Sequence, residues 1–359
     1  MSDTSIQIGD RQVGSEHRPY IVAELSANHG GKIEQALDIV SAAAAAGVDA
    51  IKLQTYTADT MTIDHHGPGF DIEGGLWHGR SLYDLYEEAH TPWDWHEALF
   101  AHGRKLGLEV FSTPFDASAV DFLESFDPPA YKIASFECTD IPLIRKVAST
   151  GKPMIISTGI ANQQEIGEAV STAIDGGAGG LCLLHCVSAY PAPSSEYNLK
   201  TILDLAESYG VVVGLSDHTL GIEIAIAATA LGASLIEKHV TNRRADGGPD
   251  SAFSLEPEEL RQMVEGCHQA FDALGAPSFV RQDSELGNAQ FRRSIYVTAD
   301  VANGEELTEA NIRCIRPGFG LPPKRYPDAL GRKAARALKR GEPLDDAAVL
   351  WEHGSLLEQ

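Results

Sequence analysis

The sequence is poor in cysteine and has no long apolar run. Its 359 residues include five cysteines and no C-x-x-C pair, and most of the five fall inside apolar segments: Cys138, Cys182, Cys186, Cys267 and Cys314. This small, odd number argues against a disulfide framework and predicts reduced thiols packed as small hydrophobic side chains. No apolar run approaches the roughly 18 residues of a membrane span, and the first residues lack the apolar centre of a signal peptide. We therefore expect a cytoplasmic protein.

Positive charge is also scarce. Lys and Arg number 28 against 51 Asp and Glu, which gives a formal net charge of −23. A general nucleic-acid binder needs a basic face for the phosphate backbone, so this class is excluded. An anionic substrate would have to be held by a local cluster of Lys and Arg. Hydrophobic residues make up 43% of the chain, which is enough for a sizeable core.

No G-x-G-x-x-G motif follows the first predicted strand, which disfavours the alternative fold, an open doubly wound sheet. The sequence instead alternates eight short β-branched runs with eight amphipathic or Ala-rich segments. Alternation of this kind predicts an α/β fold with parallel strands, and eight units over about 250 residues predict a (β/α)8 TIM barrel. The expected strands are YIVAEL, DAIKLQ, LEVFST, AYKIAS, PMIIST, LCLLHC, VVVGLS and SLIEKHV.

Two regions depart from the alternation. Residues 57–91 form a long connection rich in Gly, His and aromatic residues, which is typical of a lid or a binding loop. After Phe271 the pattern changes to short strands, Gly turns and a basic run. We therefore predict a catalytic barrel domain over residues 1–275, a linker over 276–290 and a small separate domain over 291–359.

Each predicted strand ends in polar side chains, and in a barrel these ends meet at one rim, where the chemistry is placed. In the stretch VVVGLSDHTLG, Ser216 and His218 share one parity and face the barrel mouth, while Asp217 faces away as a supporting partner. Glu237 and His239 are paired in the same way on the next strand. Because neighbouring strands lie about 4.8 Å apart, the two histidines can share a divalent metal ion with positions left open for water and substrate.

Two lysines, Lys52 and Lys132, lie in apolar strand contexts, together with hydroxyl side chains on the same rim. A cationic rim with many hydroxyl donors fits a phosphate and a carboxylate. The hydroxyl residues are Ser112, Thr113, Ser135, Ser157 and Ser216. Two alternatives remain: a Schiff-base aldolase that uses Lys52 or Lys132, and a non-enzymatic sugar- or ice-binding protein built around the C-terminal module.

The motifs AELSANHGG, AIKLQTY, FSTPFD, YKIASFE, STG, HCVSAYPAP, GLSDHTLG, EKHVT and GGPDSAFS resemble the sialic acid synthase family. The stretch RRSIYVTADVANGEELTEANIRCIRPGFGLPP resembles the antifreeze-like C-terminal domain of that family (SAF, β-clip). Within the family, YKIASFE, LYDLYEEAHTPW and EKHV are most similar to the pseudaminic acid synthases. The N-acetylneuraminate synthases tend to have YKIGSGE and ERHF at the matching places.

The resemblance implies a transferase that condenses phosphoenolpyruvate with a sugar aldehyde and depends on Mn2+, Co2+ or Mg2+. The sugar would be 2,4-diacetamido-2,4,6-trideoxy-L-altrose, and the products would be pseudaminic acid and phosphate. Synthesis of N-acetylneuraminate or legionaminic acid is the alternative within the family. The resemblance also implies a domain-swapped homodimer.

Carried over residue by residue, the resemblance gives each candidate a role. The implied phosphoenolpyruvate contacts are Lys52, Thr113, Lys132, Ser135, Ser157 and Ser216, with Ser188 standing where the neuraminate enzymes often carry Asn. The implied metal ligands are His218 and His239. The implied sugar-side residues are Glu24, Gln54, Tyr190, Asp250 and Arg316, and Arg292 stands near the place of a sugar-contacting aromatic residue.

The catalytic set expected from these roles is Glu24, Lys52, Lys132, His218 and His239. Glu24 is our choice for the carboxylate that accepts a proton from the attacking water. Arg316, in the Pro/Gly-rich stretch RPGFG, is expected to complete the active site of the partner subunit. The aromatic residues of the long connection are expected to receive the methyl group and the extra acetamido group of the sugar: Phe70, Trp77, Tyr83 and Tyr86.

Overall fold

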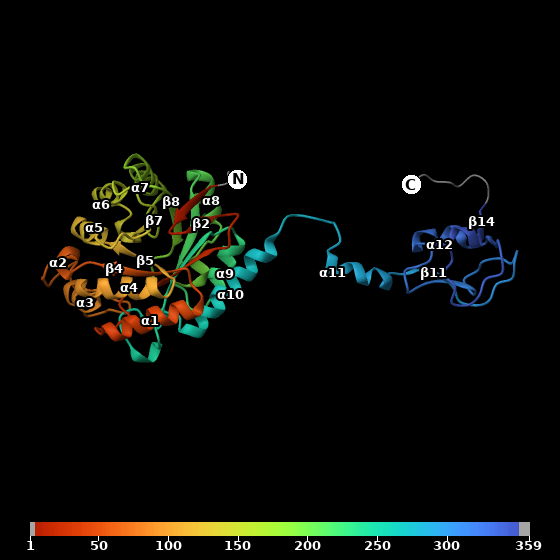
Figure 1. Ribbon diagram of the computed structural model, residues 1–359, viewed down its shortest axis with the longest axis horizontal. Coiled ribbons are helices and arrows are strands. Elements are labelled where there is room, and N and C mark those ends of the chain that lie inside the picture. Colours follow the sequence, from red (N-terminus) through yellow and green to blue (C-terminus); the bar gives the residue numbers. More distant parts are fainter. Residues whose placement is uncertain (1–3, 352–359) are drawn as a thin grey trace. The chain divides into compact units, whose positions relative to one another are not determined.

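Eight parallel strands close into a barrel, as the alternation of the sequence predicts (Figure 1). The computed structural model describes residues 4–351, so the last residues of the predicted C-terminal domain, 352–359, lie outside the described residues. Around the barrel the strands follow the order β10-β3-β4-β5-β6-β7-β8-β9. Their bounds are β3 Tyr20–Glu24, β4 Ala50–Thr55, β5 Glu109–Pro114, β6 Tyr131–Ile133, β7 Met154–Ser157, β8 Leu181–Cys186, β9 Val212–Asp217 and β10 Leu235–His239.

Helices cover the outside of the barrel, which explains why its strands are apolar on both faces. All four residues of β7, for example, are buried. Local signals set the helix ends: Asn162 and Glu165 form a capping box, and Gly47 ends the first helix with φ 85°. The covering helices are α1 Ile33–Ala46, α4 His96–Lys105, α5 Ala117–Glu124, α6 Ile141–Ala148, α7 Gln163–Asp175, α8 Thr201–Tyr209, α9 Glu223–Ala230 and α10 Pro257–Leu274. In the part of the chain that the structure describes, no helix combines the length and apolar character that a membrane crossing requires.

A short antiparallel hairpin, which the strand pattern alone did not predict, precedes the barrel. It consists of β1 Ser5–Ile8 and β2 Arg11–Gly14. Its side chains Ile8 and Val13 belong to one apolar cluster with Tyr20, Phe111 and Leu235 of the barrel strands. Most members of this cluster lie near the amino ends of their strands, so apolar packing fills this end of the barrel. The polar groups are thereby left to the carboxyl ends.

The long connection between β4 and β5 is more ordered than a plain loop. It contains two helices, α2 Ala58–Met61 and α3 Leu82–Ala89, followed by the 3-10 turn η1 Trp93–Trp95. The hydroxyl of Ser81 caps α3 by accepting from the backbone of Asp84. The other short 3-10 turns of the barrel unit are η2 Ser135–Glu137, η3 Ser194–Glu196, η4 Arg244–Asp246 and η5 Ser251–Phe253.

The chain divides into two compact units, Met1–Gly275 and Ala276–Gln359. The second unit has an apolar core of its own, which includes Ile295, Leu307 and Leu344. The segment 276–290, which we predict to be a linker, holds α11 Asp283–Leu286 and most of η6 Gly287–Phe291. The remaining elements are β11 Ser294–Val297, β12 Ile312–Ile315, η7 Pro323–Arg325, α12 Tyr326–Ala329, β13 Lys333–Ala334, η8 Asp346–Ala348 and β14 Val349–Leu350.

Candidate active site

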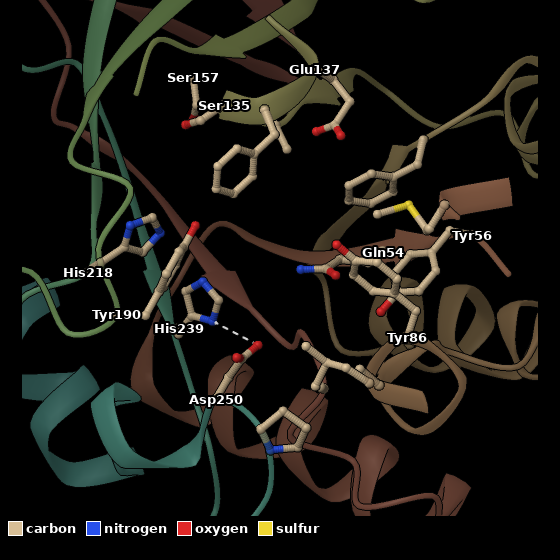
Figure 2. A pocket seen from close by; sticks show the side chains of 18 of the residues that line it. Gln54, Tyr56, Tyr86, Ser135, Glu137, Ser157, Tyr190, His218, His239 and Asp250 are labelled. Atoms are coloured by element: carbon tan, nitrogen blue, oxygen red, sulfur yellow. Dashed lines mark ion pairs between the residues drawn. The ribbon is translucent and has the colours of Figure 1, made fainter. Parts of the chain in front are cut away.

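A pocket of about 480 Å³ opens at the carboxyl ends of the barrel strands. Figure 2 shows His218, His239 and Tyr190 on one side of it, facing Gln54 and Tyr56 across the cavity. The predicted site residues that line the pocket are Lys52, Gln54, Lys132, Ser135, Ser157, Tyr190, Ser216, His218, His239 and Asp250. They come from six of the eight strands or from the loops that follow them, because barrel closure places all these ends at one rim.

Ser112, expected on the rim, does not line the pocket, because its hydroxyl lies 2.7 Å from that of Thr55 on the neighbouring strand. Four of the predicted catalytic or substrate-binding residues also do not line it. Glu24 and Thr113 are buried one layer below the lining, where both contact the ammonium group of Lys52. Ser188 lies beside the lining residue Ser135, since a Cβ atom added at Gly159 would meet both hydroxyls. Arg316 is exposed and belongs to the second unit, as does Arg292.

The floor of the pocket is a cluster of two lysines and two carboxyls. The Lys52 Nζ lies 2.7 Å from Glu24 Oε2 and 3.6 Å from Glu237 Oε1, and the Lys132 Nζ lies 3.8 Å from Glu237 Oε1. All four side chains are at most 5% exposed. The predicted cationic rim is therefore a charge-balanced cluster, since each lysine faces a carboxyl that the sequence analysis had not assigned to it.

Hydroxyl and amide groups complete the hydrogen bonding of this cluster. Lys132 Nζ donates to Ser157 Oγ at 2.7 Å, and Lys52 Nζ donates to Thr113 Oγ1 at 3.1 Å. Gln54 Nε2 donates to Glu24 Oε1 at 2.9 Å, and Ser216 Oγ donates to Glu237 Oε1 at 3.2 Å. Glu24 Oε2 is occupied by its ion pair with Lys52, whereas Glu237 Oε2 is buried without a hydrogen bond. Because Glu237 lines the pocket, this oxygen can interact with a bound molecule.

The two carboxyls of the cluster differ in acidity because they face different numbers of cations. Burial raises the pKa of Glu24, and the single ammonium of Lys52 does not offset this effect. Burial also acts on Glu237, but Lys132 and Lys52 together bring its pKa below the usual range. We therefore assign the lasting negative charge to Glu237 and the capacity to take up a proton to Glu24.

A third carboxyl, Glu137, also lines the pocket and was not among the predicted site residues. Burial raises its pKa to about 7, although Lys132 acts in the opposite direction. Its Oε2 atom is buried without a hydrogen-bond partner. The YKIASFE motif contains this residue, but only its place on η2, next to Ser135, shows that the carboxyl turns into the pocket (Figure 2).

The predicted metal ligands lie side by side at the rim. The ring centroids of His218 and His239 are 5.4 Å apart, and His239 Nδ1 lies 3.9 Å from Asp250 Oδ2. His218 Nδ1 lies 3.0 Å from the carbonyl oxygen of Val187. Because a carbonyl only accepts, this contact places a proton on Nδ1, so His218 would bind a metal through Nε2. Burial lowers the pKa of His218, but the neighbouring Cys186 raises it above the ordinary value, so metal binding would have to displace a proton from Nε2.

These residues fit a divalent metal ion held by two protein ligands. The Nδ1 atom of His239 is buried and has no hydrogen-bond partner. Burial, followed by the neighbouring His218, holds the pKa of His239 well below its ordinary value, which keeps the imidazole in the neutral form that binds metals. Among residues 4–351, no group of three or more His, Cys, Asp or Glu side chains is arranged to hold a metal. The remaining ligands would have to come from water and substrate.

An aromatic wall faces the histidines. It includes Trp77 and Tyr86 of the long connection, as we expect from the sequence, but Phe70 and Tyr83 are not among the lining residues. Tyr83 instead donates to Asp59, and Phe70 packs against His65. Sequence alone could not separate these four aromatics, because Tyr83 and Tyr86 both lie on α3, while Phe70 and Trp77 both lie in the loop between α2 and α3. Further lining residues that the sequence analysis missed are Tyr56, Met61, Ile72, Phe115 and Phe136.

Trp77 ties the long connection to the opposite rim. Its indole Nε1 donates to the carbonyl oxygen of Pro249 at 3.1 Å, and its ring centroid lies 5.7 Å from that of Tyr190. Pro249 precedes Asp250, so this contact joins the aromatic wall to the loop that carries a predicted sugar contact. The connection therefore covers one side of the pocket.

Comparison with known proteins gives a consistent result over nearly the whole chain. The model of the NeuB family matches residues 39–278, and that of the SAF domain matches residues 292–350. The pseudaminic acid synthase of Campylobacter jejuni serotype O:23/36 is 42% identical, over 95% of this chain and 99% of that protein. The pseudaminic acid synthase of Helicobacter pylori is 45% identical, over 91% of this chain and 96% of that protein.

A solved structure shares the fold. The N-acetylneuraminic acid synthetase of Leptospira borgpetersenii, determined in complex with citrate, superposes with a TM-score of 0.71 at 32% identity. The match covers 81% of this chain and 96% of that one.

Proposed function

The chain belongs to the NeuB family, and from this premise we propose that it is a pseudaminic acid synthase. The reaction condenses phosphoenolpyruvate with 2,4-diacetamido-2,4,6-trideoxy-L-altrose and gives pseudaminic acid and phosphate. The observation that carries the proposal is the arrangement of one pocket, in which the cluster of Lys52 and Lys132 lies within reach of the His218 and His239 pair. An anion and an aldehyde can therefore meet in one cavity.

Phosphoenolpyruvate is proposed to bind over the lysine cluster. Lys52 and Lys132 supply positive charge, and the hydroxyls of Ser135, Ser157 and Ser216 line the same part of the pocket. Glu237 balances charge before substrate arrives. Together with Glu24 it raises the pKa of Lys52 against the effect of burial, whereas burial lowers the pKa of Lys132 and Glu237 offsets only part of that effect. The incoming carboxylate and phosphate then find oriented donors that need little reorganisation.

His218 and His239 would hold the metal ion, and the bound metal would act as a Lewis acid toward the aldehyde oxygen of the sugar. The chain's own residues orient the reactants. Val187 fixes the His218 ring through Nδ1, and Tyr190 packs with its ring centroid 4.5 Å from that of His218. Asp250, next to His239, is proposed to accept a hydroxyl of the sugar.

The bond changes balance as follows. Carbon 3 of phosphoenolpyruvate forms a bond to the aldehyde carbon, and the aldehyde oxygen takes up a proton to become a hydroxyl. Water adds to carbon 2, and Glu24 is proposed to accept the proton that this water releases, with Lys52 between Glu24 and the pocket. The bond between carbon 2 and the phosphate oxygen then breaks, the new hydroxyl on carbon 2 gives its proton to the departing phosphate, and a 2-keto acid and phosphate remain.

The aromatic wall supports the choice of sugar. Tyr56, Trp77, Tyr86 and Phe115 offer apolar faces to a methyl group and an acetamido group. N-acetylmannosamine carries a hydroxyl where the proposed sugar has hydrogen at carbon 6. An apolar pocket rejects an added hydroxyl by about a hundredfold, so we expect a preference of that order for the diacetamido sugar.

Purified protein, phosphoenolpyruvate and a panel of acetamido sugars test the proposal directly. We expect mass spectrometry to detect pseudaminic acid, and kcat/KM for the diacetamido sugar to exceed that for N-acetylmannosamine. An equal or higher kcat/KM with N-acetylmannosamine would favour the neuraminate alternative.

Chelation tests the metal role. Exhaustive chelation is expected to abolish phosphate release, and added Mn2+, Co2+ or Mg2+ to restore it. A Schiff-base aldolase using Lys132 would remain active after chelation and would be trapped by borohydride with its carbonyl substrate. Trapping of this kind, with metal content verified as nil, would replace the proposed mechanism.

Two finer proposals accompany the function. We propose a cytoplasmic enzyme, because its expected substrates are small phosphorylated and acetamido metabolites and its thiols are free. We also propose a homodimer in which Arg316 acts in the site of the partner subunit. This second proposal rests on the family resemblance and is tested by the mixing experiment described in the Discussion.

A further inference from the structure

A fully buried ion pair lies on the outer side of the two strands that carry the histidines. Asp217 and Lys238 immediately precede His218 and His239, and the strand register places them opposite each other. Lys238 Nζ lies 2.8 Å from Asp217 Oδ2, and both side chains are 0% exposed. They point away from the pocket, since alternate residues of a strand face opposite sides.

The same lysine also reaches past His218. Its Nζ donates to the carbonyl oxygen of Thr219 at 2.5 Å. Asp217 Oδ1 accepts from the backbone nitrogen of Thr219 at 2.9 Å and from its hydroxyl at 2.8 Å. Lys238 therefore binds both neighbours of His218, the side chain of Asp217 and the backbone carbonyl of Thr219.

The contact between Lys238 and Thr219 lies just beyond the end of β9, where no strand pairing holds the chain. Strand β9 ends at Asp217, and the Asp217–Lys238 pair is the last register pair between β9 and β10. His218 lies beyond it, so the ladder of hydrogen bonds does not fix its distance from His239. A buried ion pair adds little net stability because of its desolvation cost, and positional specificity is a better-supported use of such a pair.

We propose that Lys238 and Asp217 are positioning residues that set the separation of His218 and His239, and thereby the affinity of this pair for a divalent metal ion. The inference rests on the metal role in the proposed function. It adds residues that touch neither substrate nor metal and act only through the backbone on either side of His218. Partners that orient metal ligands typically change metal affinity by about 10- to 100-fold when they are removed.

The test measures Mn2+ binding to the full chain without substrates, from the electron paramagnetic resonance signal of free Mn2+. The variants are Lys238→Met, Asp217→Asn and the double variant, which removes both charges and leaves none unpaired in the interior. We expect each to raise the Kd for Mn2+ by about 10- to 100-fold. Lys238→Arg keeps the charge and can donate to both partners, so it is expected to recover most of the affinity.

Lys152→Met is the matched control. Lys152 also forms an ion pair, with Asp127, but it precedes β7 at the amino end of the barrel. Its removal is expected to leave Mn2+ binding unchanged. Binding of phosphoenolpyruvate to the metal-free protein, followed by calorimetry, is expected to stay at the wild-type level in all these variants, because the lysine cluster does not contact the Asp217–Lys238 pair.

The outcomes separate the inference from the proposed function. If His218→Ala and His239→Ala lose Mn2+ while the double variant keeps wild-type affinity, Asp217 and Lys238 are structural only and the inference fails. If the histidine variants also bind Mn2+ as the wild type does, the metal role in the proposed function fails together with the inference. Weaker Mn2+ binding in the double variant, together with near-wild-type binding in the separate Lys238→Arg variant, supports a positioning role.

Discussion

At the scale of single residues, the chemistry of the pocket depends on which buried carboxyl holds a proton. Glu237 faces two lysines and stays ionised, while Glu24 and Glu137 have raised pKa values because burial dominates. A proton acceptor and a permanent counter-charge can therefore coexist in one cavity.

Glu24→Gln tests the proton acceptor. The substitution preserves shape and removes the basic oxygen, so kcat is expected to fall by about 10²- to 10⁴-fold, with little change in KM for phosphoenolpyruvate. Steady-state phosphate release provides the measurement. Glu109→Gln, at the amino end of β5, is the matched control and should keep the wild-type kcat. If Glu24→Gln retains most of its kcat, the acceptor is another carboxyl.

Glu137 predicts a pH effect on substrate binding. With a pKa of about 7, its carboxyl is neutral below that pH and becomes an anion beside Lys132 above it. The new charge opposes the substrate anion, so KM for phosphoenolpyruvate should rise by about three- to tenfold between pH 6 and pH 8. Glu137→Gln is expected to remove this rise. The same rise in both proteins would assign the titration to another group.

The ionisation of Glu137 should also make the free energy of unfolding depend on pH. The pKa of Glu137 in the folded state lies above its ordinary value of 4.5. The contribution of this carboxyl to the free energy of unfolding is therefore fully present below pH 4.5 and is lost as the pH rises through about 7. The unfolding free energy of the wild type, relative to Glu137→Gln, should therefore fall by up to about 3 kcal/mol over this range. Denaturant titrations at pH 5 and pH 8 measure the difference.

At the scale of elements, the connection between β4 and β5 decides which face the sugar meets. Helix α3 carries Tyr83 and Tyr86, and Trp77, in the loop before α3, attaches the connection to the rim through its hydrogen bond to Pro249. The barrel strands supply the charged floor, and this one insertion supplies much of the apolar wall. Anion binding and sugar selectivity are thus carried by different elements.

Substitutions at Trp77 test this division. Trp77→Phe loses the hydrogen bond to Pro249 and keeps a ring, so KM for the sugar should rise about fivefold. Trp77→Ala loses both and should raise it by more than about tenfold. KM for phosphoenolpyruvate should stay unchanged in both variants.

Tyr83→Phe is the control from the same connection. It loses the hydroxyl contact to Asp59, outside the pocket lining, and should behave as the wild type does. A parallel rise in both KM values for Trp77→Ala would show that the connection supports the whole site and not the sugar subsite.

At the scale of the whole molecule, the chain consists of two units, and the proposed dimer assigns them to different tasks. Arg316 follows β12 in the second unit, in a loop held by Ser294 Oγ donating to the Pro317 carbonyl at 2.6 Å. The loop is therefore fixed while the arginine itself is exposed. An exposed guanidinium on a fixed loop suits recognition of a planar acetamido or carboxylate group.

Mixing two inactive homodimers tests whether Arg316 acts in the partner's site. Glu24→Ala and Arg316→Ala proteins should each be nearly inactive. After subunit exchange, one site of every heterodimer carries neither substitution, so about a quarter of wild-type activity should return on random mixing. Tagged pull-down verifies the exchange. If exchange is complete and no activity returns, Arg316 acts within its own chain or not at all.

The sequence by itself determined the barrel and the membership of most of the rim. Eight β-branched runs separated by helical segments admit few other folds, and the alternation of side chains along a strand placed Ser216 with His218 and Glu237 with His239. These results follow from local periodicity together with the closure of a parallel sheet. Both can be recognised without knowing any contact between distant residues.

Only the tertiary structure decided what each rim residue faces. Closure of β10 against β3 brings Glu237 between Lys52 and Lys132, which turns an expected cationic rim into a balanced cluster. The inward turn of Glu137 depends on the 3-10 turn η2, and the choice of Trp77 over Tyr83 depends on the contact of Trp77 with Pro249; periodicity resolves neither. The contact of Lys238 with Thr219 depends on where β9 ends. Such contacts join residues far apart in the chain, and their energies come from burial and charge in three dimensions, which a linear pattern does not contain.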